Sequence, residues 1–193
     1  MSTVQAIQPM MDAIRKIPTS LPGVFVLEPR VFRDERGFFF ESYNQQITAG
    51  VGIVDSFVQD NHSSSTRNVL RGLHYQVKRP QGKLVRVVEG EILDVAVDLR
   101  RSSATFGRWE AVRLSEENKR MLWIPVGLAH GFRVLSEKAQ VLYKATDFYA
   151  PEHERTLAWN DPQLKIDWEL EGEPIVSGKD QRGVTLSAAE TFE

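Results

Sequence analysis

The chain has 193 residues, with 24 Lys and Arg against 26 Asp and Glu, a net charge of −2 and no cysteine. The lack of cysteine excludes thiol catalysis, cysteine zinc sites and disulfide scaffolds, and the charge balance excludes a basic surface for nucleic acid. No run approaches the roughly 20 apolar residues needed to cross a bilayer. We expect a cytoplasmic protein, not associated with a membrane, whose partner is a small anionic ligand.

The first 20 residues are expected to be an N-terminal extension of a single domain over residues 21–193, a length at which one domain buries a full core. A short amphipathic helix, ended by Pro18, is predicted within this extension. Its apolar face would consist of Ile7, Met10, Met11 and Ile14.

From residue 24 the chain changes to short segments rich in Val, Phe, Ile and Trp, separated by turn signals. This spacing indicates the strands of an all-β sandwich or barrel. Helical stretches are few: one or two turns over Ser115–Arg120, and a capping-box spacing between Ser187 and Glu190. The predicted strands are Val24–Glu28, Gly37–Tyr43, Val54–Gln59, Val69–Gln76, Lys83–Val88, Glu91–Leu99, Arg108–Leu114, Met121–Ile124, Gly131–Leu135 and Val141–Tyr149.

The stretch from residue 68 to 86 carries two cations and a titratable imidazole on one predicted hairpin. Arg71 and His74 lie on its first strand, and Lys83 opens the second. Strict alternation would put Arg71 and His74 on opposite faces of their strand. A lone histidine is often structural, and the basic residues could be ordinary surface charge. Three groups suited to anion binding and proton transfer on one hairpin favour a functional site.

Alternation is clearest in the predicted strand Glu91–Leu99, where one face is apolar and the other carries Asp94 and Asp98. The acids would face solvent, or Asp94 would line a ligand cavity inside a barrel. Both alternatives stay open. After Tyr149 the chain becomes rich in loops, and its apolar residues predict that this tail packs across the sheet. These residues are Trp159, Leu164, Ile166 and Trp168.

The motifs RGLHYQ with GK, and PVGLAHGF, resemble the two motifs of the cupin superfamily, which usually hold a metal through three histidines and a carboxylate. The first motif has HYQ where a metal-binding cupin has two histidines, so only His74 and His130 remain as ligands. Two ligands rarely hold a catalytic metal. We therefore expect neither a metal nor a cofactor, and a metal-dependent cupin oxygenase or isomerase is kept as an alternative.

Seven ordered motifs resemble those of the dTDP-4-dehydrorhamnose 3,5-epimerase family over about residues 22 to 185. Several motifs in register are more specific than any one of them. They are DERGFFFESYN at 34–44, FVQDNHS at 57–63, NVLRGLHYQ at 68–76, QGKLVR at 81–86, LWIPVGLAHGF at 122–132, LYKATDFYAPEHE at 142–154 and SGKD at 177–180.

The resemblance implies an all-β, cupin-type jelly-roll β-barrel with a few short helices, acting without metal as a strand-sharing homodimer. It implies inversion of C3 and C5 of dTDP-4-dehydro-6-deoxy-D-glucose, a dTDP-linked 4-keto-6-deoxy sugar, to give dTDP-4-dehydro-L-rhamnose for dTDP-L-rhamnose biosynthesis. It makes His74 the general base and Asp180 its orienting partner. Lys83 and Tyr143 complete the implied catalytic group.

The chemistry accounts for these residue types. A C4 ketone acidifies the protons at C3 and C5, so a neutral imidazole can remove one if a cation such as Lys83 meets the charge that develops on the ketone oxygen. Inversion needs a proton from the opposite face, for which the phenol of Tyr143 is the candidate acid. Asp180, accepting from the other imidazole nitrogen, would fix the tautomer of His74.

For binding, planar guanidinium groups suit a diphosphate, and Arg71 is the first candidate, followed by Arg36 and Arg30. By resemblance, Gln59, Asn61 and His130 line the sugar and phosphate region. The resemblance also implies that residues of the N-terminal strands contact the nucleotide across the dimer interface; these are Phe32, Arg36 and Glu41. Asp94 and Tyr149 complete the expected substrate-binding residues.

The chain departs from the family pattern at Phe148-Tyr149, where the family often has paired tyrosines. This difference leaves one hydroxyl contact and the extent of epimerisation open. One rival function is therefore a mono-epimerase that acts only at C3 or only at C5 of a related dTDP-4-keto-deoxysugar. Another is a non-catalytic sugar-nucleotide-binding cupin, which the presence of the complete catalytic group argues against.

Overall fold

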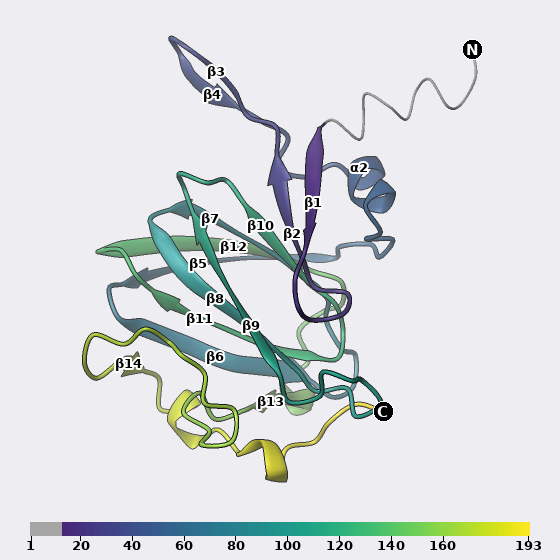
Figure 1. Ribbon diagram of the computed structural model, residues 1–193, viewed down its shortest axis with the longest axis vertical. Coiled ribbons are helices and arrows are strands. Elements are labelled where there is room, and N and C mark those ends of the chain that lie inside the picture. The colour runs from purple at the N-terminus through teal and green to yellow at the C-terminus, as the bar shows by residue number, and fades with distance from the viewer. Residues whose placement is uncertain (1–12) are drawn as a thin grey trace.

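The computed structural model describes residues 13–193, which form two large β-sheets packed face to face and a separate hairpin (Figure 1). The first sheet has the strand order β1 (Ile14–Pro18), β2 (Phe25–Pro29), β10 (Met121–Ile124), β7 (Lys83–Glu89), β12 (Lys138–Ala145) and β5 (Gln59–Thr66). The second has the order β13 (Glu154–Thr156), β6 (Val69–Gln76), β11 (Leu128–Val134), β8 (Glu91–Asp98) and β9 (Trp109–Ser115), with β14 (Ile175–Val176) pairing in parallel with β6. The predicted all-β jelly-roll barrel is confirmed.

The main core fills the space between the two sheets. Val85 and Val141 of the first sheet pack in the same buried cluster as Ile92 and Phe132 of the second. Since alternate residues of each strand point inward, the apolar half of the pattern is removed from water here. Much of the interior is therefore apolar, which makes any polar side chain inside it informative.

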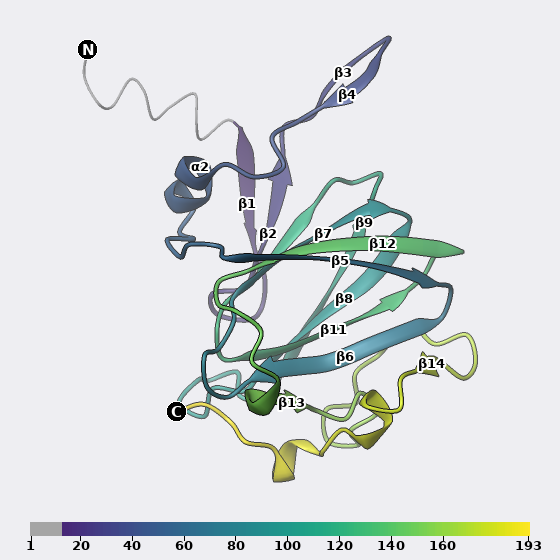
Figure 2. The same cartoon turned by 180° about the vertical axis from the view of Figure 1, so that it is seen from behind.

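A second core lies on the outer face of the second sheet, beneath the C-terminal tail. Leu73 and Val95 from the sheet pack with Leu157, Leu164 and Trp168 from the tail. In Figures 1 and 2 the yellow-green tail runs along the outside of β6. The prediction that the tail packs across the sheet is confirmed. Both faces of β8 are consequently buried beyond Glu91, and Asp94 lies on the inner face of the strand with Ile92 and Ala96.

The outer face of the first sheet carries the helix α2 (Gln45–Gly50), which the sequence analysis missed. Asn44 caps the helix by accepting from the backbone N–H groups of Gln46 and Ile47. Ile47 then packs against Trp123 and other residues of the sheet. A helix of six residues is too short to be stable alone, so this tertiary contact stabilises it.

The hairpin of β3 (Phe32–Asp34) and β4 (Gly37–Phe39) stands away from the barrel in Figures 1 and 2. Its aromatic side chains are exposed, with 53% of Phe32, 53% of Phe38 and 69% of Phe39 accessible. Exposed apolar surface on an unpaired hairpin is typical of a segment that packs on a partner.

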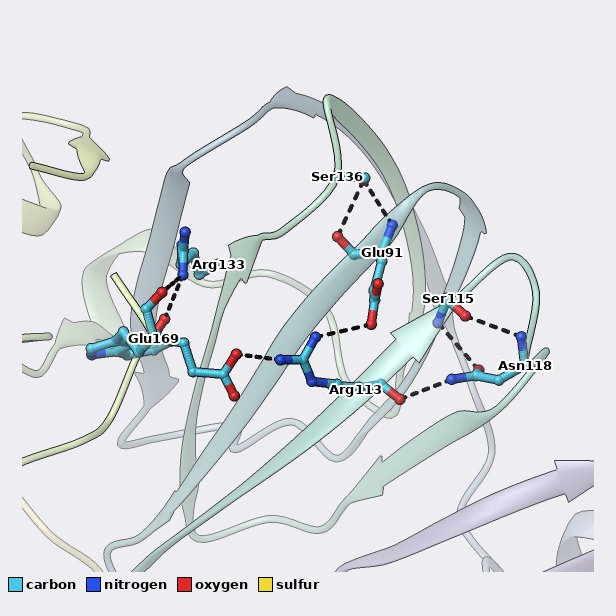
Figure 3. Close-up of polar contacts among 8 residues, drawn as sticks. Glu91, Arg113, Ser115, Asn118, Arg133, Ser136 and Glu169 are labelled. Atoms are coloured by element: carbon cyan, nitrogen blue, oxygen red, sulfur yellow. Dashed lines mark hydrogen bonds and ion pairs between the residues drawn. The ribbon is translucent and has the colours of Figure 1, made fainter. Parts of the chain in front are cut away.

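Several predicted boundaries are wrong. The strand predicted over Val54–Gln59 begins only at Gln59, and the strand predicted over Val141–Tyr149 runs instead from Lys138 to Ala145. The helix predicted over Ser115–Arg120 is a turn, in which the side chains of Ser115 and Asn118 bond each other's backbone N–H groups (Figure 3). Local side-chain bonds of this kind offer the backbone an alternative to helix.

The two ends of the chain also differ from prediction. The predicted N-terminal helix mostly lies outside the described residues. Its last apolar position, Ile14, is the first residue of β1. β1 therefore lies within the predicted extension, and it pairs with β2 of the barrel. The predicted capping box at Ser187 is a 3-10 turn, η3 (Leu186–Ala188), without a side-chain cap. Two other short 3-10 turns are η1 (Pro151–His153) and η2 (Asp180–Arg182). No helix between residues 13 and 193 is long and apolar enough to span a membrane.

Candidate active site

A pocket of about 560 Å³ opens between the sheets beside β6, a size within the usual range for small-molecule sites. Its walls bring together strands from both sheets and the tail segment after β14. Every residue of the predicted catalytic group lines it, as does Arg71. The full lining is Ser63, Val69, Leu70, Arg71, His74, Lys83, His130, Gly131, Phe132, Tyr143, Ile175, Val176, Ser177, Lys179 and Asp180.

Arg71 and His74 reach the same pocket because β6 contains an irregularity. Its pairing with β11 shifts register between the pairs Phe132–Arg71 and His130–His74, which places one extra residue on β6. Arg71 and His74 therefore line one cavity, and the prediction that they face opposite sides is wrong.

Gly72 is required at this irregularity. Its φ is +111°, and an added Cβ would lie 2.6 Å from the Cα of Gly131 on β11. A larger residue would force β6 and β11 apart, because both the backbone angle and the contact exclude a side chain. The glycine in the sequence RGLH thus determines where the flanking arginine and histidine point.

His74 and Asp180 form a direct pair, with His74 Nε2 2.5 Å from Asp180 Oδ1. Asp180 comes from the tail: Ser177 Oγ accepts from its backbone N–H, and its own carboxylate accepts from the backbone N–H of Gly72. Burial acts to raise the pKa of Asp180, but the hydrogen bonds from His74, Ser177 and Gly72 outweigh it and the net pKa is lowered. Asp180 is thus an anion that holds one ring nitrogen of His74.

Lys83 opens β7 on the opposite sheet and is buried. Its Nζ lies 3.5 Å from the backbone carbonyl oxygen of His74 and 5.7 Å from the ring centre of Tyr143. Burial lowers the pKa of Lys83 to about 8, against the opposing attraction of Asp94. At neutral pH the side chain is a desolvated cation, the state in which it interacts most strongly with a developing negative charge.

Tyr143 lies on β12, also in the sheet opposite His74. Burial raises the pKa of Tyr143, and the charge of Glu154 adds to this effect. Its ring packs edge-on against His130 at a centroid distance of 6.5 Å. The phenol therefore stays protonated over the physiological range and is available as a proton donor.

His130 and Asp94 form a second pair inside the barrel, with His130 Nε2 2.7 Å from Asp94 Oδ1. This contact shows that Asp94 faces the interior and not solvent. Asp94 contacts His130, which lines the pocket, but is not itself part of the pocket lining, so its role in substrate binding stays a prediction. Burial lowers the pKa of His130 although Asp94 attracts its proton. The second carboxylate oxygen of Asp94 is buried without a hydrogen-bond partner among the described residues.

Of the polar residues predicted for substrate binding, Arg71 and His130 line the pocket, whereas Gln59, Asn61 and Tyr149 are not part of its lining. Arg71 donates from Nε to Ser65 Oγ at 2.9 Å, which fixes its guanidinium at the pocket wall on the β5 side. Gln59 and Asn61 lie further along β5 and bond each other at 3.0 Å. Gln59 also accepts from the backbone N–H of Tyr149, so the segment after β12 is held at this end of the barrel.

The sequence analysis missed Glu154 and Lys179, which form an ion pair of 2.5 Å at the pocket. Glu154 also accepts from the hydroxyl of Tyr149 at 2.7 Å. Burial acts to raise the pKa of Glu154, but these two donors outweigh it and the net pKa is lowered. Lys179 directly precedes Asp180 in the SGKD motif, and that position was the available signal.

The residues predicted to contact the nucleotide lie outside this pocket. Phe32 and Arg36 are on the projecting hairpin, where Arg36 pairs with Asp34, and the Arg30 guanidinium lies over the ring of Phe32. Glu41 accepts from Asn44 beside α2. A contact made across a dimer interface would not appear within one chain, so their role stays a prediction. Between residues 13 and 193 no three His, Asp or Glu side chains lie close enough to hold a metal ion.

Comparisons with known proteins agree with this geometry. The family described as dTDP-4-dehydrorhamnose 3,5-epimerase matches residues 18–188. A dTDP-4-dehydrorhamnose 3,5-epimerase from Pseudomonas aeruginosa is 62% identical over 174 residues, which cover 90% of this chain and 96% of that protein.

Two solved structures share the fold. A dTDP-6-deoxy-D-glucose-3,5-epimerase from Legionella pneumophila, in complex with dTDP-4-keto-L-rhamnose, is 49% identical with a TM-score of 0.90, covering 92% of this chain and 95% of that one. A 3′-monoepimerase from Streptomyces bikiniensis, in complex with dTDP-quinovose, is 34% identical with a TM-score of 0.83, covering 89% and 87%. On these matches over most of its length, the chain belongs to the dTDP-4-dehydrorhamnose 3,5-epimerase family.

Proposed function

We propose that this chain inverts C3 and C5 of dTDP-4-dehydro-6-deoxy-D-glucose and releases dTDP-4-dehydro-L-rhamnose, without a metal or cofactor. One observation carries the proposal: His74 and Tyr143 line a single pocket from opposite sheets. An inversion needs a proton to leave one face of the sugar and another to arrive on the opposite face. Two titratable groups on opposite walls meet that requirement.

In the proposed mechanism each side chain of the catalytic group has one role. His74 takes a proton from the carbon beside the C4 ketone, and the electron pair moves onto the ketone oxygen as an enolate. Asp180 stabilises the imidazolium formed at His74, and the buried ammonium of Lys83 stabilises the enolate. Collapse of the enolate draws a proton from the hydroxyl of Tyr143 on the other face. Solvent then restores the proton of Tyr143 and removes that of His74 before the second carbon reacts.

For binding, Arg71 and Lys179 supply positive charge at the pocket wall for the diphosphate. Two solved relatives were crystallised with dTDP-linked sugars, and one from Bacillus anthracis holds TDP and pyrophosphate, which supports the same ligand class here. The exposed hairpin β3–β4 would pack on a second copy of the chain and bring Phe32, Arg36 and Glu41 to the partner's nucleotide. A dimer mass by light scattering is expected.

The test is an exchange experiment. The protein is incubated with dTDP-4-dehydro-6-deoxy-D-glucose in heavy water, and the C3 and C5 signals are followed by proton NMR. Deuterium at both carbons is expected in heavy water, and a parallel reaction in light water should give the coupling constants of the L-rhamno product. A chelator should not change the rate. Absence of exchange at one carbon would contradict the proposal and leave a mono-epimerase. Absence at both carbons would leave a sugar-nucleotide-binding protein.

A mono-epimerase is the second candidate, favoured by the 34% identity to the 3′-monoepimerase and by Phe148 in place of a paired tyrosine. The same spectra distinguish it, because inversion would then occur at one carbon while the other keeps its configuration. The cytoplasmic location and the single domain over residues 21–193 remain predictions.

A further inference from the structure

Arg133, on β11, is a buried cation with no carboxylate partner within residues 13–193. Its side chain points to the outer face of the second sheet and the residue is only 2% exposed. The guanidinium donates to the backbone carbonyls of Trp168 and Glu169 and to Asn68 Oδ1, at 3.0 Å for Trp168 and 3.2 Å for Asn68 (Figure 3 draws the Glu169 contact). Burying a charge without a counter-ion costs free energy, so the burial of Arg133 beneath the tail needs an explanation.

Asn68 extends this contact along the tail. It occupies the turn between β5 and β6 with a φ of +65°. Its Nδ2 donates to the carbonyl of Glu173 at 2.7 Å, and its own carbonyl accepts from the backbone N–H of Ile175 at 3.0 Å. Arg133 and Asn68 together fix the tail at residues 168, 169, 173 and 175. We call these two residues the tail clamp.

The tail clamp holds the tail immediately before the segment that carries Asp180. Ile175 and Val176 form β14, which pairs with Val69 and Leu70 at the start of β6. The next residue, Ser177, accepts from the backbone N–H of Asp180, whose carboxylate contacts His74. His74 lies on β6, and Asp180 begins η2 only four residues after the end of β14. The register of β14 on β6 therefore limits where Asp180 can meet His74.

The tail has a second attachment that offers a matched control. The side chain of Glu169 pairs with Arg113 of β9, which also pairs with Glu91 of β8, as Figure 3 shows. Arg113 is about half exposed, with 52% of its side chain accessible, and exposed ion pairs contribute little to stability. Removing Arg113 leaves the tail clamp intact.

We propose that Arg133 and Asn68 are positioning residues for catalysis: the tail clamp sets the register of β14 on β6 and thereby holds Asp180 against His74. This inference rests on the proposed function, since it concerns the same base. Neither residue lines the pocket, so their effect is expected on turnover more than on nucleotide binding.

The experiment uses Asn68→Gly, because glycine adopts a positive φ freely and only the side-chain bonds are lost. We expect kcat to fall about tenfold while KM changes less than about threefold, as misplacement of a catalytic group by a fraction of an ångström costs that much. Arg133→Lys, which keeps the charge but loses the planar fork, should behave alike. Arg113→Met should retain kcat within about twofold of the wild type.

A double-mutant cycle separates positioning from general damage. In the Asp180→Asn background the carboxylate is already gone, so adding Asn68→Gly should slow the enzyme by less than about twofold. A loss of equal size in both backgrounds, or wild-type kcat in Asn68→Gly, would overturn the inference. Wild-type exchange is measured first: its absence counts against the proposed function, whereas normal wild-type turnover with an unaffected Asn68→Gly counts against the tail clamp alone.

Discussion

The barrel contains two His–Asp pairs of nearly the same geometry and different surroundings. In the pair His74–Asp180 the histidine side chain is 28% exposed and the acid 4%, whereas in His130–Asp94 the values are 6% and 0%. The two histidines face each other across neighbouring strands as a paired position of β6 and β11. The same hydrogen bond therefore occurs once at a partly exposed imidazole and once at a nearly buried one. We call His130–Asp94 the enclosed pair, although His130 also lines the pocket.

The origin of the acid explains this difference. Asp94 belongs to β8, the strand next to β11, so its pair forms within one regular sheet and is covered by the opposite sheet. Asp180 arrives from the tail, outside the barrel, and approaches His74 without closing the pocket. A base needs both an orienting acid and access to its substrate. The comparison teaches that a carboxylate supplied by the tail can orient the base while the base stays accessible to its substrate.

The largest expected effect separates the two histidines. His74→Asn should lower kcat by about two to four orders of magnitude, the usual value of general-base assistance, with little change in dTDP affinity. His130→Asn keeps a donor for Asp94 and should lower kcat by less than about tenfold. Steady-state kinetics and dTDP titration measure both variants. Equal losses in the two variants would break the comparison.

Substitution of the two acids should show the same order of effects, with a larger loss of kcat for Asp180 than for Asp94. Asp180→Asn removes the charge that stabilises the imidazolium, so kcat should fall by about two orders of magnitude or more. Asp94→Asn should reduce kcat less, because asparagine still accepts from His130. Thermal unfolding of both variants serves as the control for folding. A larger kcat loss in Asp94→Asn would assign the catalytic role to the enclosed pair.

Tyr143→Phe tests the two-wall geometry. His74 should still form the enolate, but protons should return mainly to the face that they left. Inversion should drop by about two orders of magnitude while deuterium exchange at C5, and to a lesser degree C3, continues. Proton NMR in heavy water measures the two rates in one sample. If Tyr143 only positions the sugar, exchange and inversion will fall in proportion.

The smallest expected effect is a shift in the pH dependence of kcat/KM, caused by the charge of Asp94 in the enclosed pair. Lys83, whose pKa burial lowers to about 8, must be protonated to meet the enolate, so kcat/KM should fall about tenfold per pH unit above that value. The attraction of Asp94 raises this pKa, so Asp94→Asn should move the decline to lower pH. A pH profile of both proteins measures the shift, and an unchanged profile would contradict the assignment.

The free energy of unfolding should rise with pH over the range in which kcat/KM falls. The pKa of Lys83 is about 8 when folded and 10.5 as its ordinary value, so the unfolded chain binds more protons between these values. The free energy of unfolding should therefore rise with pH through this window as far as Lys83 contributes. Denaturant unfolding at several pH values measures it, with Lys83→Met as the variant that lacks this contribution.

Much of the fold and half of the site geometry could be predicted from the sequence. Short alternating segments identified the barrel, because burial on one face leaves a period of two in the residues themselves. His74, Lys83, Tyr143 and Asp180 were identified from the resemblance of local motifs to those of the family. The apolar tail residues predicted packing on the sheet for the same reason: large apolar side chains must be removed from water.

What only the tertiary structure decided depends on contacts between distant segments. The extra residue in β6, fixed by the approach of Gly72 to Gly131, turns Arg71 and His74 to one side against the alternation rule. Asp94 faces inward because the tail buries the other face of its strand. Asp180 meets His74 because β14 pairs with β6. Periodicity reports which face of a regular strand is buried, but strand pairing across the chain determines where a bulge falls and which side chains it brings together.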